Sequence, residues 1–237
     1  MRGMFAGLLA ALCAIAFAKV VAEPQIARAE RFEHQLDVQR HRAGDTALVP
    51  RDIQDTLGLG TGFAVVGVAL GGLYGLAFAA VYRRLTGAGA QATAAFLAAG
   101  AFAAIFLVPF LKYPANPPSV GNPDTIGQRT ALHFLLIAVG LIAVGLAVIV
   151  QRGNAARFGT WNATLLAIGT GVAVVAFSYI VMPGANEVPI GFPPTVLWKF
   201  RLASLGTQLV LWACIGVLFG ALTNRRESSP MSIQTSI

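Results

Sequence analysis

Six long apolar runs limit this chain to a fold that is built inside a lipid bilayer. An α-helix needs about 20 apolar residues to cross the hydrocarbon core of about 30 Å. A helix that is apolar on every side must face lipid or other helices, whereas a helix of a water-soluble domain keeps a polar face. The runs cover residues 4–22, 59–82, 92–111, 130–150, 161–182 and 202–223. They predict an all-α, polytopic integral membrane helical bundle with about six transmembrane helices.

The composition and the residue pattern agree with this prediction. Charged residues make up 11% of the chain and hydrophobic residues 56%, whereas a soluble domain carries about a quarter charged residues. Membrane barrel strands alternate polar and apolar residues, and these runs do not alternate. Helices are therefore the only regular element that we expect.

The first run also has features of a cleaved signal peptide. Arg2 precedes it, and residues 16–18 (Ala-Phe-Ala) have the small-x-small form of a cleavage site. However, the run continues to Ala22, which is long enough to span the bilayer with the Lys19 side chain extended to the interface. We therefore expect the segment to be retained as the first span.

The loops predict the orientation and the domain organisation. Six spans place both termini on one side of the membrane, together with the compact basic turns at Arg83-Arg84 and at Arg152 and Arg157. Short basic loops favour the cytoplasmic side, so we expect both termini in the cytoplasm. The total count of Lys and Arg on the two sides does not favour this orientation. We expect one membrane domain over residues 1–237, a polar outer loop over 23–58 that is partly helical, and a flexible tail over 224–237.

Glycines recur at helical spacing in two of the runs. Gly67, Gly71 and Gly75 share one face of the second run, and Gly216 and Gly220 share one face of the sixth. Small residues at this spacing let two helix backbones approach closely. We expect these faces to be helix contacts.

Polar groups at membrane depth are costly, so they are candidates for function. His133 lies one turn into the fourth run, either as an interfacial histidine bonded to a loop or as a metal ligand. Glu23 and Glu187 lie where the first and fifth runs end. Each carboxylate either pairs with a nearby basic side chain or coordinates a cation together with Asn186.

A second candidate cluster lies in the first outer loop. If residues 22–43 continue as a helix, Glu30, His34, Asp37 and His41 share one stripe. Imidazole and carboxylate groups suit divalent cobalt, nickel or zinc. A solvated helix face of mixed charge is the alternative.

Several function classes have no support in the sequence. The chain lacks a phosphate-binding loop, a nucleophile elbow, a zinc-protease His-Glu pair and a dinucleotide fingerprint. We therefore expect no enzyme activity and no permanently bound cofactor. The net charge of +7 comes from basic residues beside the runs, so it does not indicate nucleic-acid binding.

A set of loop motifs carries a family resemblance. The most distinctive is Val-Pro-Phe-Leu-Lys-Tyr-Pro-Ala-Asn-Pro-Pro, and the matching stretches are residues 23–26, 67–72, 108–118, 124–130, 186–189 and 197–204. In this order along six runs, the chain resembles the probable cobalt transporter subunit family, CbtA, over essentially its whole length. The resemblance implies an integral membrane subunit of a cobalt importer linked to cobalamin supply. It also implies a small single-span companion, CbtB, with a histidine-rich tail.

The leading hypothesis is thus a permease subunit for a divalent transition-metal ion, with Co²⁺ as the transported ion, in the plasma membrane of a prokaryote. The eight candidate ligands are Glu23, Glu30, His34, Asp37, His41, His133, Asn186 and Glu187. Lys112, Arg129, Lys199 and Arg201 are expected to fix the loops. Because the central runs hold almost no polar groups, a non-transporting scaffold that docks a partner protein is the alternative. Association with further copies of the chain is left open.

Overall fold

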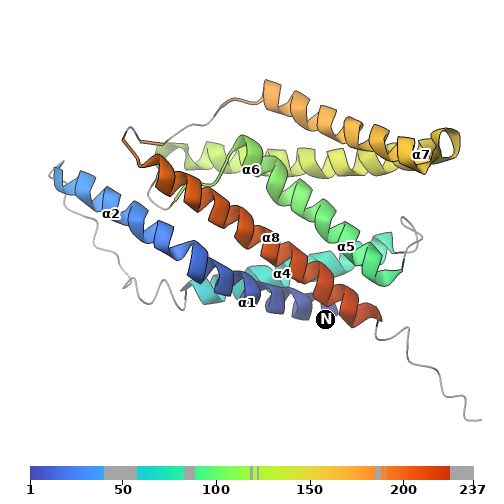
Figure 1. The fold of residues 1–237 in the computed structure, drawn as a ribbon, viewed down its shortest axis with the longest axis horizontal. Helices are drawn as coiled ribbons and strands as arrows, with labels where there is room; N and C mark the ends of the chain where they lie inside the picture. Colours follow the sequence, from blue (N-terminus) through green and yellow to red (C-terminus); the bar gives the residue numbers. More distant parts are fainter. Residues whose placement is uncertain are drawn as a thin grey trace, which may run out of the picture. The chain divides into compact units, whose positions relative to one another are not determined.

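The computed structural model of the chain describes residues 1–39, 58–82, 89–117, 120–121, 123–184, 188–189 and 191–224. All regular elements in these ranges are helices, which confirms the all-α prediction (Figure 1). The elements are α1 (Arg2–Val21), α2 (Glu23–Gln39), α4 (Leu59–Val81), α5 (Ala90–Ala101), the π-helix η2 (Phe102–Leu107), α6 (Val108–Lys112), the 3₁₀ turn η3 (Pro123–Thr125), α7 (Ile126–Val181) and α8 (Pro194–Asn224).

Five helical segments of the described residues are long and apolar enough to cross a membrane. The longest, α7, has 56 residues and contains one non-helical residue, Gly159, with φ 76° and ψ 159°. Figure 1 shows that the two arms of α7 on either side of this turn fold back along each other. Counted separately, the arms bring the apolar segments to six, so the chain is a polytopic membrane protein.

Two helices begin earlier than the apolar runs that predicted them. α7 begins at Ile126 and α8 at Pro194, whereas the runs begin at residues 130 and 202. For α8 the first residue is Pro194, and proline is favoured in the first turn of a helix because its missing N–H is not needed there. As a result, Arg129 and Arg201 lie on helices and not in loops.

The chain divides into two compact units. One consists of residues 1–18, 45–99 and 206–237, and the other of residues 19–44 and 100–205.

In the first unit, α1 and α4 touch through glycines. A Cβ built on Gly71 of α4 would lie 2.8 Å from the Cα of Gly7 of α1, and a Cβ built on Gly67 would lie 2.6 Å from the Cβ of Ala11. Real Cβ atoms do not approach so closely, so only glycine fits. The face predicted from the glycine spacing is a helix contact, and its partner is the glycine face of α1.

The second glycine pair of the same unit also lies in a helix contact. A Cβ on Gly216 of α8 would lie 2.7 Å from the Cβ of Ala98 of α5. Beside this contact, the Tyr74 hydroxyl of α4 donates to the carbonyl oxygen of Ala94, and the Tyr74 ring packs edge-on against Phe219 at 5.2 Å. The polar tip of the tyrosine is thus satisfied inside an apolar contact.

In the second unit, α2 packs through one of its faces. Gln25 and Ala29 are buried, at 9% and 2% exposure. One turn further along, Phe32 packs edge-on against Phe192, with 5.2 Å between ring centroids. The polar segment after the first span is therefore a docked helix over its described part.

Candidate functional site

The third span of the chain is interrupted by a π-helical stretch, η2, directly before Pro109. The N–H of Val108 bonds to the carbonyl oxygen of Ala103, five residues earlier. Pro109 has no N–H, and its ring obstructs the carbonyl four residues before it, so a regular α-helix is disfavoured at this point. π-Helical turns in α-helices occur frequently at functional sites.

The first arm of α7 packs directly on this stretch. A Cβ built on Gly140 would lie 2.9 Å from the Cα of Ala104 in η2. Pro109, in the first turn of α6 just after the stretch, is also fully buried. The backbone of α7 therefore contacts the backbone of η2, where the third span changes from α-helical to π-helical hydrogen bonds.

Three hydrogen bonds fix the chain after η2 to the end of α7. Lys112 Nζ donates to the Tyr179 carbonyl oxygen at 2.8 Å, and the Tyr179 hydroxyl donates to the Val108 carbonyl oxygen. The Tyr113 hydroxyl donates to the Pro183 carbonyl oxygen at 2.7 Å. Burial raises the pKa of the Tyr113 phenol above its usual value, so the group stays protonated and remains a donor at neutral pH.

Arg201 connects α8 to the same segment. Its Nε donates to the Ala115 carbonyl oxygen at 3.3 Å, and its guanidinium donates to Asn116 Oδ1 at 3.1 Å. The described contacts of Lys112 and Arg201 are thus with carbonyl and amide oxygens. From the sequence, these two side chains were expected to pair with acidic side chains of the loops. The loop over residues 113–117 is fixed at both ends.

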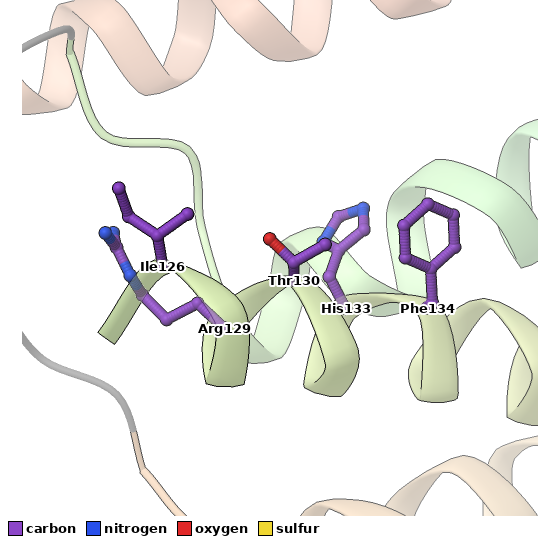
Figure 2. Close-up of a pocket in the computed structure, with 5 residues that line it drawn as sticks. All are labelled: Ile126, Arg129, Thr130, His133 and Phe134. Atoms are coloured by element: carbon purple, nitrogen blue, oxygen red, sulfur yellow. The ribbon is translucent and has the colours of Figure 1, made fainter. Parts of the chain in front are cut away.

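Two pockets that share Arg129 and His133 lie at the start of α7: the smaller lies between this loop and α7, and the larger is lined by α7 residues alone. The smaller has a volume of about 210 Å³ and is lined by Tyr113, Pro114, Asn116, Val120, Arg129, Leu132 and His133. The larger, of about 390 Å³, is more open and is lined by Ile126, Arg129, Thr130, His133 and Phe134. Figure 2 shows these five side chains on one side of α7. Neither pocket has an Asp or Glu among its described lining residues.

Replacement of Arg201 by methionine is expected to loosen the loop. The change removes two hydrogen bonds from a charged donor, so the protein should lose about 2 kcal/mol of stability. Thermal unfolding in detergent measures this loss. Lys199→Met, on an exposed position of the same helix, is the control. Equal melting temperatures for the two variants would show that the Arg201 contacts contribute little.

A comparison with protein families identifies the chain. The model of the probable cobalt transporter subunit (CbtA) matches residues 1–224. The chain belongs to this family. No curated protein and no solved structure is significantly similar to it. As a member of the CbtA family, the chain is a membrane protein and a probable cobalt transporter subunit. A subunit implies at least one partner in the transporter.

The structure describes only part of the metal site that the sequence predicts for this CbtA chain. Asn186, Glu187 and His41 lie outside the described residues. Glu23, Glu30 and His34 lie on α2, and Asp37 continues the same helix. His133 lies two turns into α7, on the wall of both pockets. Within the described ranges, no three His, Cys, Asp or Glu residues come together as a metal site.

On α2 the predicted ligands share one face. Glu23, Glu30 and His34 are separated by seven and four residues, so they lie above one another on the helix. This face is roughly opposite the packed face of Gln25 and Ala29. Glu23 already pairs with Lys19, with 3.1 Å between Nζ and Oε2.

The contacts that η2, Tyr113 and Tyr179 make were not predicted from the sequence. Pro109 inside an apolar run was the available signal, because an internal proline disturbs a helix. Tyr113 and Tyr179 gave a weaker signal, since tyrosine is common at membrane interfaces. Their partners are backbone oxygens far along the chain, and no residue pattern indicates those.

Proposed function

We propose that this chain is a permease subunit that carries a divalent transition-metal ion, Co²⁺, across the plasma membrane of a prokaryote into the cytoplasm. The observation that carries the proposal is the family match, which covers all six apolar segments. Both termini are cytoplasmic in this proposal, because the compact basic turns then follow the positive-inside rule. The described residues contain no nucleotide-binding loop, so energy comes from a partner subunit or an ion gradient.

The exposed face of α2 gathers the ion in this proposal. Glu30 and His34 lie one helical turn apart, which lets a carboxylate and an imidazole reach one ion. Oxygen and nitrogen ligands of this kind suit Co²⁺. Asp37 and His41, which the sequence predicts as further ligands, are assigned to the same ion, and a partner supplies the ligands that complete the coordination sphere. A single-span, histidine-rich subunit of the CbtB type or a second copy of this chain fits that role.

The mouth of the path is assigned to Glu23, Asn186 and Glu187, where the first and fifth spans end. Glu23 is held by Lys19, so an incoming ion competes with an ammonium group. The inward step is assigned to His133, on the wall of both pockets. Arg129 lines both pockets beside His133, and its positive charge repels a bare cation.

The alternative function is a scaffold that docks a partner without carrying the ion. The observation that favours it is the absence of carboxylates from the described lining of both pockets. Uptake by membrane vesicles that contain this chain as the only added subunit separates the two functions. Cobalt accumulation above the level of empty vesicles removes the scaffold alternative.

Radioactive cobalt uptake tests the role of the α2 stripe. The double variant Glu30→Ala and His34→Ala should need at least about tenfold more cobalt for half-maximal uptake, because it removes two ligands. Gln35→Ala is the matched control, since Gln35 is exposed on α2 but lies on another face. Glu23→Ala and Glu187→Ala test the mouth in the same assay. If all variants insert normally and accumulate cobalt like the unaltered chain, the proposed ligands are wrong.

A further inference from the structure

The first and the last spans of the chain, α1 and α8, pack together in the first unit. A Cβ built on Gly206 of α8 would lie 2.7 Å from Cζ of Phe17, near the end of α1. A Cβ built on Gly75 of α4 would lie 3.6 Å both from the Cα of Gly3 and from Cε2 of Phe219. The end of α1 thus lies beside Gly206, and the start of α1 lies near Phe219. The two spans therefore run in opposite directions.

Between these two contacts, α1 and α8 carry the only two cysteines of the chain. Cys13 lies one turn before Phe17 on α1. Cys214 lies about two turns after Gly206 on α8. The two side chains are close enough for a hydrogen bond between the thiols. Cys13 is exposed and Cys214 is half-buried, so the pair lies at the surface of the unit.

Two thiols in contact suit a soft metal ion that takes few ligands. Thiolate sulfur is a soft donor that selects ions such as Cu⁺, and Cu⁺ and Ag⁺ accept two sulfur ligands on opposite sides. Co²⁺ prefers more ligands and harder donors than this pair supplies. Among the residues that the structure describes, no third His, Cys, Asp or Glu joins the pair. The chemistry of the pair therefore differs from that of the oxygen and nitrogen ligands on α2.

The position of the pair in the membrane favours a monovalent ion. Cys13 lies near the middle of an apolar span, where a net charge is costly. On binding, one thiol releases its proton to water and its sulfur bonds to the ion as a thiolate. The other sulfur donates a lone pair as a neutral thiol, and no electron is transferred. The charge of the ion balances that of the thiolate, so the complex is as neutral as the free thiols.

We propose that Cys13 and Cys214 form a binding site for a soft monovalent metal ion, Cu⁺ or Ag⁺, which bridges α1 and α8. The ion links the first span to the last, so its binding stabilises the contact between them. This site is independent of the proposed transport of cobalt, because it uses other residues and other donor atoms.

Silver titration of the purified full chain in detergent, followed by native mass spectrometry, tests the site. The unaltered chain should bind one Ag⁺ most tightly, and its mass should rise by one silver atom less one proton. Cys13→Ser and Cys214→Ser should each weaken the binding of this ion at least about tenfold, because each removes one of the two ligands. X-ray absorption of the silver-loaded unaltered chain should show two sulfur neighbours for each ion. This last measurement needs no variant, so it stays decisive if a variant does not fold.

The matched control keeps both thiols and separates them. Cys13→Leu combined with Leu12→Cys moves one thiol to a neighbouring exposed position of α1, about 100° around the helix axis. This double variant should bind Ag⁺ as weakly as the two serine variants. The proposal is overturned if the double variant or either serine variant binds Ag⁺ like the unaltered chain. It is also overturned if bound silver has only one sulfur neighbour, or if Co²⁺ at equal concentration displaces Ag⁺.

Discussion

Gly71→Val is expected to force α1 away from α4 and to destabilise the protein by about 3 kcal/mol. A Cβ at this position would lie 2.8 Å from the Cα of Gly7, which is backbone and cannot rotate away. The branched valine adds two further methyl groups to the same contact. Thermal unfolding of the detergent-purified variant, together with its elution as a single species from a sizing column, measures the loss.

The control for this prediction lies on the same helix. Gly62 of α4 has no atom within 4 Å of a built Cβ, so Gly62→Val adds the same side chain in open space. This variant should melt like the unaltered protein to within about 0.5 kcal/mol. Equal losses at the two positions would mean that valine harms α4 itself and that the contact with α1 is not the cause.

Gly159→Ala is expected to cost about 1 to 3 kcal/mol, because φ 76° with ψ 159° is a conformation that essentially only glycine adopts. No atom lies within 4 Å of a built Cβ at this position, so the whole effect comes from the backbone. Alanine favours continuation of the helix, and a straight helix of 56 residues would be about 84 Å long. Such a helix greatly exceeds the bilayer thickness.

The matched change Gly153→Ala should have the opposite sign. Gly153 is helical and also has open space around its built Cβ. Alanine there should stabilise α7 by about 0.5 to 1 kcal/mol. If both alanine variants shift the melting temperature in the same direction, the turn at Gly159 does not depend on its positive φ.

Cross-linking between the arms reports on the turn directly. A Cβ on Gly171 would lie 3.8 Å from the Cβ of Ala147, which is the spacing of a disulfide. Ala147→Cys with Gly171→Cys, in a background without Cys13 and Cys214, should therefore cross-link under mild oxidation. Adding Gly159→Ala should lower the cross-linked fraction.

Much of the fold follows from local pattern. The apolar runs place the spans because any uninterrupted stretch of about 20 apolar residues must leave water. The spacing of Gly67 and Gly71 predicts a close helix contact because every fourth residue shares a face. The helical part of the polar segment after the first run was expected as well, and its register places Glu30 and His34 on one face.

The candidate site was predicted less completely. His133 was singled out from the sequence as a polar group in a span, and it lies on the wall of two pockets. Arg201 was expected to fix a loop through acidic side chains, and it fixes the loop through the Ala115 carbonyl oxygen and the Asn116 amide oxygen. The contact of Tyr179 was not foreseen, because its acceptor lies 71 residues away along the chain. Glu23 was considered as a metal ligand or an ion-pair partner, and the structure pairs it with Lys19.

By itself, the sequence determined that this protein folds in a lipid bilayer, where its spans lie, that it is helical and which family it belongs to. Each of these depends on residue type and order along short segments. Only the tertiary structure decided that the glycines of α4 meet those of α1, and that the third span changes to a π-helix where Gly140 packs against it. It also decided that Arg129 and His133 line two pockets whose described lining residues include no carboxylate. These features depend on which segments meet in space. Close packing and hydrogen bonding between distant residues determine that, and no local residue pattern records it.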